Sequence, residues 1–315
     1  MIIKFSAAIA AAVGVVLLVV FLSTSTGEKG LLAHFDDIDA TDKTPVLLRY
    51  KFQQGQKLVF ECAAESITAV DDYGGRGGGI QRVETVHEFE VSSVDENGVA
   101  VMEMLLKKIV LETGGEIGHR KVEMTPDNVR VFEGEKEIEP EEEDIRVREI
   151  FPWKYKLEVT PRGKILSGTV PEKRAGSIRQ LNMFLQSFFP ELPEGQATPG
   201  EEYDTVPAWK SDKLIERTSD KNECLGYKNH GGRRCAVLKK SFSFHVRPRP
   251  EEGFREDREG ESVTGIFFSL EDGLAPLTFM SVESEWESKS EGMSMKGSSR
   301  EEAIIRLVSD TAPGK

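Results

Sequence analysis

Apolar side chains alternate with polar ones along several long segments of this chain, and a glycine-containing turn follows many of them. The clearest pair runs from "VETVHEFEVSSV" through "DENG" to "VAVMEMLLKKIVLE", with His87, Phe89 and Val91 on one side of the first segment. A period of two residues is typical of a half-buried strand, and Asp95–Gly98 supply turn residues. The pattern predicts a mainly β protein made of antiparallel hairpins.

The same alternation begins at residue 46. "VLLRYKF" places Val46, Leu48, Tyr50 and Phe52 on one face, "QQGQ" is a turn, and "KLVFECAAESITAV" continues with Leu58, Phe60 and Cys62 on one face. We expect a hairpin here. Late in the chain, "LAPLTFMSVESEWESKS" has one mostly apolar face and one acidic face, as expected for a sheet that is exposed to water on one side.

One segment has helical rather than β periodicity. In "SIRQLNMFLQSFFP", apolar residues recur at helical spacing: Ile178, Leu181, Phe184, Leu185 and Phe188. Ser177 is a suitable N-cap and Pro190 ends the helix. The fold expected is therefore β-rich α+β, with a curved antiparallel sheet or half-barrel covered by this aromatic amphipathic helix.

The chain divides into five predicted parts. They are a signal anchor or signal peptide over 1–26, a flexible tether over 27–45, hairpins ending in the helix over 46–190, a Pro/Gly-rich connector over 191–209, and a second hairpin half over 210–310. The second half either extends the same sheet or forms a second sheet packed on it.

The N-terminus predicts the compartment. The stretch Phe5–Leu22 has no charge and is long enough to cross most of a bilayer. It is either an uncleaved transmembrane helix or a cleaved signal peptide. Lys4 precedes it, and positive charge stays cytoplasmic, so we expect the rest of the chain to be extracytoplasmic and attached to the cytoplasmic membrane, or secreted after cleavage.

Composition limits the classes of partner. The chain has 315 residues and a formal net charge of −13, with 38% hydrophobic and 30% charged residues. It can therefore build a core, and its acidic surface disfavours nucleic acid. The expected partners are the membrane, through the N-terminal helix, and either an apolar ligand or an envelope protein.

Two cysteines flank the segment "LGYKNHGGRR". With Asn229–His230 at the tip of a hairpin, Cys224 would lie directly opposite Cys235, close enough for a disulfide. Two free thiols and a metal site are the alternatives, but zinc needs four ligands and the segment offers two cysteines and one histidine. We expect the disulfide and no metal, and we expect Cys62 to be a buried structural thiol.

Catalytic motifs with known spacing are missing from the sequence. There is no HExxH, no GxSxG and no GxGxxG before a helix, and the five histidines are scattered. A triad can assemble from distant segments, so a hydrolase with an unrecognised active site stays a lesser alternative. We expect no enzymatic activity and no cofactor.

The layout resembles a family of uncharacterised bacterial secreted or membrane-anchored proteins. The similarity lies in "LLRYKFQQGQKLVFE", "VSSVDENGVAVMEM", "VTPRGKI", "FFPELPEG" and the Cys224–Cys235 hairpin. It implies a fold of the lipoprotein-carrier type, a curved half-barrel with helices on its concave side. Such carriers bind acyl chains in an apolar groove, but a shared fold does not establish a shared ligand.

These observations lead to one functional expectation and its alternative. The chain is expected to be an extracytoplasmic, membrane-tethered, β-rich binding protein for an apolar or lipid ligand. The walls of the site would include Phe184, Leu185, Phe188, Phe60 and Phe89. Alternatively these side chains fill a closed core, and the protein is an interaction or structural module of the cell envelope.

Overall fold

The computed structural model describes residues 31–72, 75–115, 118–169, 185–204, 215–246, 255–290 and 293–311. The apolar stretch Phe5–Leu22 lies outside these residues, as does Phe184. In the part of the chain that the structure describes, no helix combines the length and the hydrophobicity that a membrane span requires.

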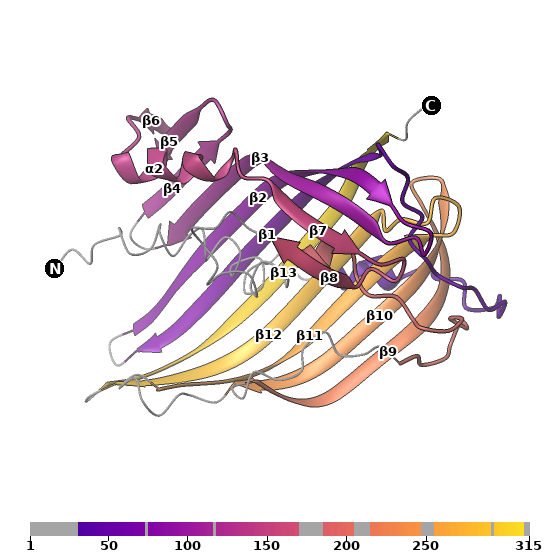
Figure 1. Ribbon diagram of the computed structural model, residues 1–315. Helices are drawn as coiled ribbons and strands as arrows, with labels where there is room; N and C mark the ends of the chain where they lie inside the picture. Colours follow the sequence, from indigo (N-terminus) through magenta and orange to yellow (C-terminus); the bar gives the residue numbers. More distant parts are fainter. Residues whose placement is uncertain are drawn as a thin grey trace.

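A single antiparallel sheet of 13 strands dominates the molecule (Figure 1). Its strands are β1 (Lys57–Asp72), β2 (Gly75–Val94), β3 (Ala100–Gly115), β4 (Gly118–Met124), β5 (Val129–Glu133), β6 (Lys136–Ile138), β7 (Tyr155–Val159), β8 (Ile165–Thr169), β9 (Ile215–His230), β10 (Arg233–Val246), β11 (Arg255–Ser269), β12 (Leu277–Ser290) and β13 (Met293–Thr311). The order across the sheet is β6-β5-β4-β3-β2-β1-β13-β12-β11-β10-β9, and β7 pairs with β3 and β8. The expected β class is confirmed.

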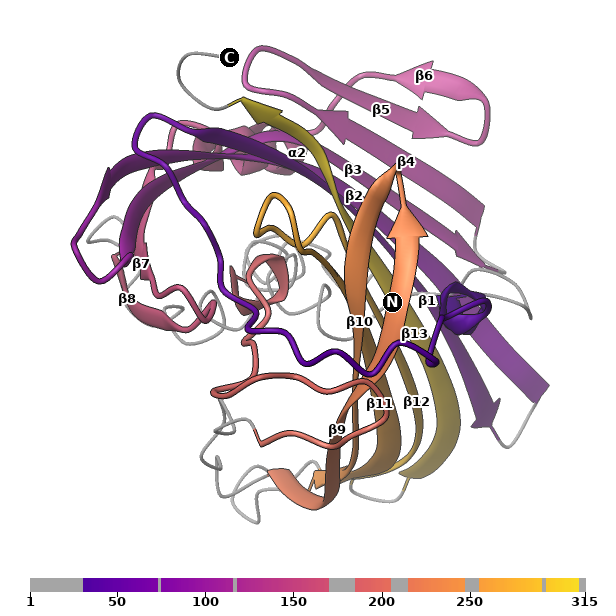
Figure 2. The same cartoon turned by 90° about the vertical axis from the view of Figure 1, so that its right-hand side faces the viewer.

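The first long strand and the last one lie side by side and join the two halves of the chain. β1 pairs with β13 from Lys57↔Thr311 to Asp71↔Lys296. Both halves therefore belong to one sheet, which settles the alternative of a second sheet packed on the first. The sheet is open and curved, and Figure 2 shows residues 185–204 on its concave side.

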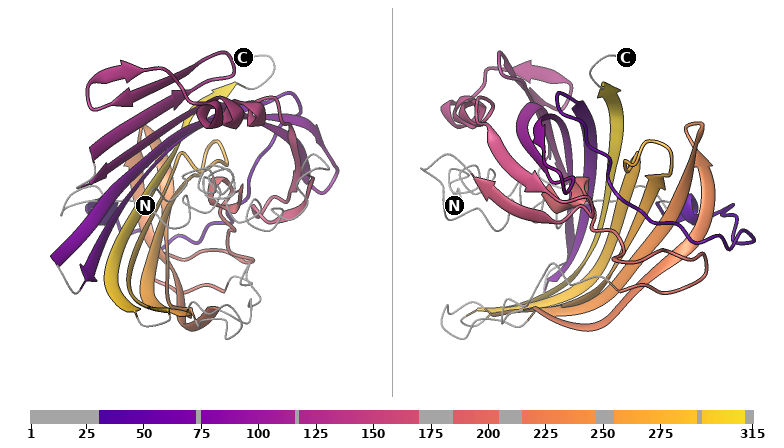
Figure 3. Two further views of the ribbon diagram at one scale, coloured as in Figure 1. Left: turned by 90° about the vertical axis from the view of Figure 1, so that its left-hand side faces the viewer. Right: turned by 45° about the vertical axis from the view of Figure 1, so that its right-hand side comes forward.

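Each face of the sheet buries its own apolar cluster. On the concave face, Phe60, Phe89, Leu238 and Ile266 belong to the main core. On the convex face, a smaller cluster around Phe267 and Phe279 is covered by Phe35 of the 3-10 helix η1 (Leu31–Phe35). Figure 3 shows the indigo segment that contains η1 on the other side of the strands from the β7–β8 hairpin.

A third apolar cluster lies at the β4–β6 end of the sheet. There the short helix α2 (Glu142–Val147) and the 3-10 helix η2 (Arg148–Ile150) bury Val147 and Ile150 against Ile109 and Met124. The acidic run 139–144, which would suit a solvated loop, contains the start of α2. The Asp144 carboxylate accepts hydrogen bonds from the Arg120 guanidinium at 3.0 and 2.8 Å and from the Glu141 backbone N–H at 3.0 Å.

The first predicted hairpin is wrong. Residues 46–52 do not pair with β1, which pairs with β2 and β13. They run instead through the concave side, where Leu48, Tyr50 and Phe52 are buried. The Tyr50 backbone N–H donates to the carbonyl of Pro161 at 2.7 Å, and that of Lys51 donates to Gly273 at 3.1 Å. Alternation identified the buried side of this segment correctly, but it cannot identify the partner.

The turn of the β7–β8 hairpin positions these interior segments. Gly163 has a φ of 83°, a left-handed conformation that favours glycine. A Cβ at this position would lie 2.7 Å from the Tyr50 ring and 2.8 Å from the carbonyl oxygen of Phe189. The glycine of "VTPRGKI" is therefore required both by backbone conformation and by the close approach of two other segments.

The described residues of the predicted tether and of the predicted connector pack against the sheet. The predicted tether, 27–45, has its described residues against the sheet: the backbone N–H groups of Asp39 and Tyr227 each donate to the other residue's carbonyl. The predicted connector, 191–209, buries Leu192 and Ala197 in its described part. Both segments cover sheet surface that would otherwise face water, including the edge strand β9.

The predicted disulfide is also wrong, because the β9–β10 turn is centred elsewhere. Gly231 and Gly232, with φ of 56° and 78°, form the turn, so His230 pairs with Arg233. This register places Cys224 opposite Leu238 and Cys235 opposite Lys228. A β-bulge at Val237/Leu238 contributes to placing Cys224 in the concave core and Cys235 in the convex cluster. Cys62, Cys224 and Cys235 are free and buried.

Candidate functional site

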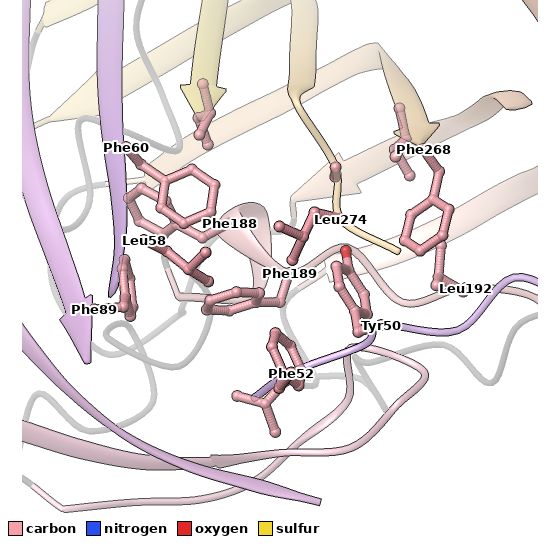
Figure 4. Close-up of a cluster of buried hydrophobic side chains, with 14 of the residues drawn as sticks. Tyr50, Phe52, Leu58, Phe60, Phe89, Phe188, Phe189, Leu192, Phe268 and Leu274 are labelled. Carbon is pink, nitrogen blue, oxygen red and sulfur yellow. The ribbon is translucent and has the colours of Figure 1, made fainter. Parts of the chain in front are cut away.

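The apolar zone of the concave face is formed by Leu58 and Phe60 of β1, Phe89 of β2, Leu238 of β10, and Ile266 and Phe268 of β11. Leu185, Phe188, Phe189 and Leu192 pack onto this zone from the segment that crosses the concave side (Figure 4). Residues 185–188 are helical, and Pro190 follows, as the sequence predicted for the end of the helix. The Gln186 side chain anchors the segment by donating to the Gly163 carbonyl at 2.8 Å.

Four of the five predicted wall residues meet in this zone. The Phe188 ring centroid lies 5.4 Å from that of Phe60 and 5.3 Å from that of Phe89, and Leu185 belongs to the same cluster. The fifth, Phe184, lies outside the described residues. None of the four is more than 2% exposed. Their rings contact one another at distances typical of packed aromatic pairs.

The concave face changes character farther along the same strands. Cys62 pairs with Ile305 and Thr85, Ala64 pairs with Ala303 and Val83, and Ser66 pairs with Glu301. Ala64 and Ala303 are the small side chains of a middle zone between the apolar zone and the polar residues beyond. The face therefore runs from large apolar groups through small ones to polar and charged ones.

The polar end of the face contains four hydrogen-bonded side chains, which we term the Arg258–Glu301 network: Arg258 of β11, Ser284 of β12, and Ser299 and Glu301 of β13. The guanidinium of Arg258 donates to the hydroxyls of Ser284 and Ser299, each at 2.9 Å, and to Glu301 Oε1. Ser299 also donates to Glu301 Oε1 at 3.1 Å, and the two serine hydroxyls are 2.9 Å apart. Cross-strand pairing explains the assembly, because Ser284 lies opposite both Gly260 and Ser299.

Two polar atoms at this end have no hydrogen-bond partner among the residues that the structure describes. Glu301 is 3% exposed and its Oε2 is unpartnered; Ser262 is 1% exposed and its Oγ is unpartnered. Burial raises the pKa of Glu301 to about 7, against the opposing effect of Arg258. A buried polar atom without a partner costs about 1–3 kcal/mol, so such atoms are rare unless a site uses them.

Aromatic rings flank the network. A Cβ at Gly260 would lie 2.9 Å from Cζ of Phe244, and a Cβ at Gly297 would lie 2.7 Å from Cε2 of Trp286. Both rings therefore lie against glycine backbone. Trp286 pairs with Gly297 and Arg258, so the three residues lie on the same face of the sheet. The two rings give the polar end apolar borders.

Arg258 and Glu301 are not among the residues that the sequence predicted for a site. Ser284 and Trp286 lie on the face of "LAPLTFMSVESEWESKS" that the sequence predicted to be mostly apolar, whereas Arg258 stands in "FREDREGES" and Glu301 in "SREEAIIRLVSD", two segments rich in charged residues. These segments belong to the strands β11 and β13, which both have neighbours on two sides. The available signal was the alternation Ser299, Glu301, Ala303 and Ile305 along one face.

The three thiols are poor nucleophiles. Burial raises the pKa of Cys62 to about 12 and the pKa values of Cys224 and Cys235 to about 11. Since the thiolate is the reactive form, these groups are unreactive at neutral pH. Among the described residues, no three His, Cys, Asp or Glu side chains gather in a way that could hold a metal ion.

A surface groove of about 560 Å³ lies beside α2. Its lining is formed by Pro126, Glu142, Ile145, Arg146, Arg148, Glu149, Phe151 and Pro152. It shares no residue with the apolar zone or the Arg258–Glu301 network.

Comparison with known proteins gives distant structural likenesses only. No protein-family model matches the chain, and no curated protein matches its sequence. A structure of lipovitellin described in terms of lipid–protein interactions is similar over 84% of this chain, with 8% identity and a TM-score of 0.39; this chain spans only 26% of that one. An exported protein of YmcC-like fold from Bacteroides fragilis matches over 85% of this chain and 100% of its own length, with 7% identity and a TM-score of 0.26. An outer-membrane lipoprotein-sorting domain from Vibrio parahaemolyticus matches over 81% of this chain and 86% of its own length, with 8% identity and a TM-score of 0.13.

Proposed function

We propose that the protein binds a lipid-type amphipathic ligand on the concave face of its sheet and acts outside the cytoplasm without chemical turnover. In this proposal the acyl chain lies over the middle zone, near Ala64 and Ala303, next to the apolar zone. Leu185 and Phe188, which belong to the predicted Ile178–Phe189 helix, border this site, and the polar part of the ligand lies toward the Arg258–Glu301 network.

The observation that carries the proposal is the gradient along the concave face. A sheet face that only fills a core is expected to be apolar throughout, because buried polar groups are costly. Here the large rings of the apolar zone give way to Ala64 and Ala303 and then to the ion pair of Arg258 with the buried Glu301, within a few residues of the same strands. An amphipathic molecule would complement this order of surfaces.

The proposed location rests on the sequence. The uncharged stretch Phe5–Leu22 has the length of a membrane anchor or signal peptide, and Lys4 precedes it.

The test is to purify the full-length chain in an amphipathic polymer, extract bound lipid and identify it by mass spectrometry. Binding of a pyrene-labelled acyl probe is then measured for two matched variants. Ala64→Phe fills the middle zone and should reduce probe binding about tenfold or more. Ala63→Phe puts the same ring on the exposed face of the same strand and should leave binding within about twofold of the original. Equal binding by both variants, with no co-purified lipid, would contradict the proposal.

A second candidate function has one observation in its favour. On the exposed convex face, Glu259 of β11 lies opposite Glu285 of β12, and Glu261 lies opposite Glu283. Like charges directly opposite one another destabilise a sheet, so a basic envelope partner would relieve the repulsion. Calorimetric titration with an oligolysine peptide tests this: Glu285→Lys should weaken binding, and Glu133→Lys, an exposed change on β5, should not.

A further inference from the structure

The hydrogen bonds and charges of the Arg258–Glu301 network indicate which kind of head group could bind there. The following inference rests on the proposed lipid-type ligand and specifies its polar end. Glu301 uses Oε1 to accept from both Arg258 and Ser299, while Oε2 of the same carboxyl has no partner. A ligand could therefore bind to Oε2 without disturbing the existing hydrogen bonds.

A second unpartnered atom lies on the same face. Ser262 pairs with Val282, and Val282 pairs with Glu301, so Ser262 and Glu301 are two strands apart in one cross-strand row. Adjacent strands lie about 4.8 Å apart, which separates the two backbone positions by about 10 Å. A ligand with more than one polar group could satisfy both atoms at once.

The charges of the network disfavour charged head groups. A carboxylate or phosphate would be close to the Glu301 carboxyl, and an ammonium would be close to the Arg258 guanidinium. Since these two side chains already pair with each other, neither offers an uncompensated charge to a ligand. The hydroxyl of Ser262 can donate and accept, and Glu301 Oε2 accepts when ionised. Hydroxyl groups of a ligand complement both atoms without adding charge.

The aromatic borders agree with this chemistry. The Phe244 and Trp286 rings lie against Gly260 and Gly297 on either side of the network. Apolar ring surfaces can contact the C–H groups of a glycerol or sugar unit while its hydroxyls reach the polar side chains.

We propose that the Arg258–Glu301 network recognises an uncharged, polyhydroxylated head group, of the glycerol or sugar type, through Glu301 Oε2 and Ser262 Oγ. The head is bound at the polar end of the concave face, and the acyl chain extends over Ala64 and Ala303 toward the apolar zone.

The test uses the full-length chain in an amphipathic polymer and three pyrene-labelled probes with the same hexadecyl-type chain. They are a monoacylglycerol, the free fatty acid and the corresponding alkylammonium. We expect the monoacylglycerol to bind about tenfold more tightly than either charged probe. Equal or tighter binding of a charged probe would overturn the head-group assignment and leave the proposed lipid binding intact. If no probe binds at all, both proposals fail.

Two variants test whether Glu301 and Ser262 bind the head group. Glu301→Gln and Ser262→Ala should each weaken monoacylglycerol binding about tenfold and leave fatty-acid binding within about twofold. The matched control is Glu302→Gln. Glu302 is the next residue, is also buried and also accepts from an arginine, Arg300, but it faces the other side of the sheet. Unchanged monoacylglycerol binding in both variants, or an equal loss in Glu302→Gln, would overturn the proposal. Ser262→Ala removes only one oxygen and so gives a result even if Glu301→Gln fails to fold.

Discussion

The apolar zone and the Arg258–Glu301 network share one sheet face but are stabilised in different ways. In the apolar zone, Phe188 and Phe189 pack among rings from other segments, and the contacts are numerous and individually weak. In the network, a few directional hydrogen bonds hold the Arg258–Glu301 ion pair, and among the described residues Glu301 Oε2 and the nearby Ser262 Oγ have no hydrogen-bond partner. The apolar zone is closely packed, whereas the network and Ser262 leave hydrogen-bonding capacity unused. This difference is what separates a core from a candidate binding site.

The largest effect should come from the apolar zone. Phe189→Ala removes a fully buried ring that contacts Tyr50, Phe52, Phe60 and Phe89, and should lower the free energy of unfolding by about 3–5 kcal/mol. Urea denaturation followed by circular dichroism measures it. Leu166→Ala, at an exposed position, is the control and should change stability by less than about 0.5 kcal/mol. A loss below about 1 kcal/mol at Phe189 would show that this zone is not a packed core.

Breaking the ion pair of the network should lower the free energy of unfolding. Arg258→Met leaves the Glu301 carboxyl buried without its cation, and should cost about 3 kcal/mol at pH 8. The pKa of Glu301 is already raised, so without Arg258 the carboxyl should be neutral at pH 5, and the loss should be smaller there. The double variant Arg258→Met with Glu301→Leu should recover most of the stability. A loss that is the same at both pH values would contradict this account.

His87, which pairs with Phe60 in the apolar zone, should make the stability of the protein depend on pH. It is buried beside the Phe188 ring, 5.0 Å between centroids, and burial lowers its pKa from 6.5 to about 3. Because the folded state resists protonation, its stability is complete above pH 6.5 and falls as the pH decreases toward 3, by about 1.4 kcal/mol per pH unit. Between pH 6 and pH 4 the loss is therefore roughly 2–3 kcal/mol. In the His87→Gln variant this loss of stability between pH 6 and pH 4 should disappear, as measured by urea denaturation at each pH. If the variant keeps the same pH dependence as the original protein, His87 is not its cause.

The smallest expected effect is an increase, not a decrease, in the free energy of unfolding. Ser262→Ala removes a buried hydroxyl without a partner, so the ligand-free protein should become more stable by about 1 kcal/mol. Ser299→Ala removes a hydroxyl that bonds Arg258, Ser284 and Glu301, and should destabilise by about 1–2 kcal/mol. Thermal unfolding of lipid-free protein measures both. Destabilisation by Ser262→Ala would mean that its hydroxyl already has a structural role.

The candidate site could be predicted only in part from the sequence. Periodicity correctly placed Phe60 and Phe89 on one face and identified Leu185 and Phe188 as apolar helical residues that cover a sheet. It gave no reason to select Arg258 or Glu301, because each stands in a run of charges that would suit an exposed loop. Their burial depends on β11, β12 and β13 lying side by side, and the alternation within one strand does not show how neighbouring strands are aligned.

Local patterns in the chain were enough to predict the β class, hairpins such as β2–β3, and which side of most strands is buried, because these depend on a period of two residues and on turn residues close in the chain. Three other features depend on long-range packing. β1 pairs with the distant β13, residues 46–52 enter the concave side instead of pairing with β1, and the β-bulge at Val237/Leu238, beyond the Gly231–Gly232 turn, puts Cys224 and Cys235 on opposite faces. Alternation is the same for any partner strand, so partner and register are settled by the packing of the whole sheet.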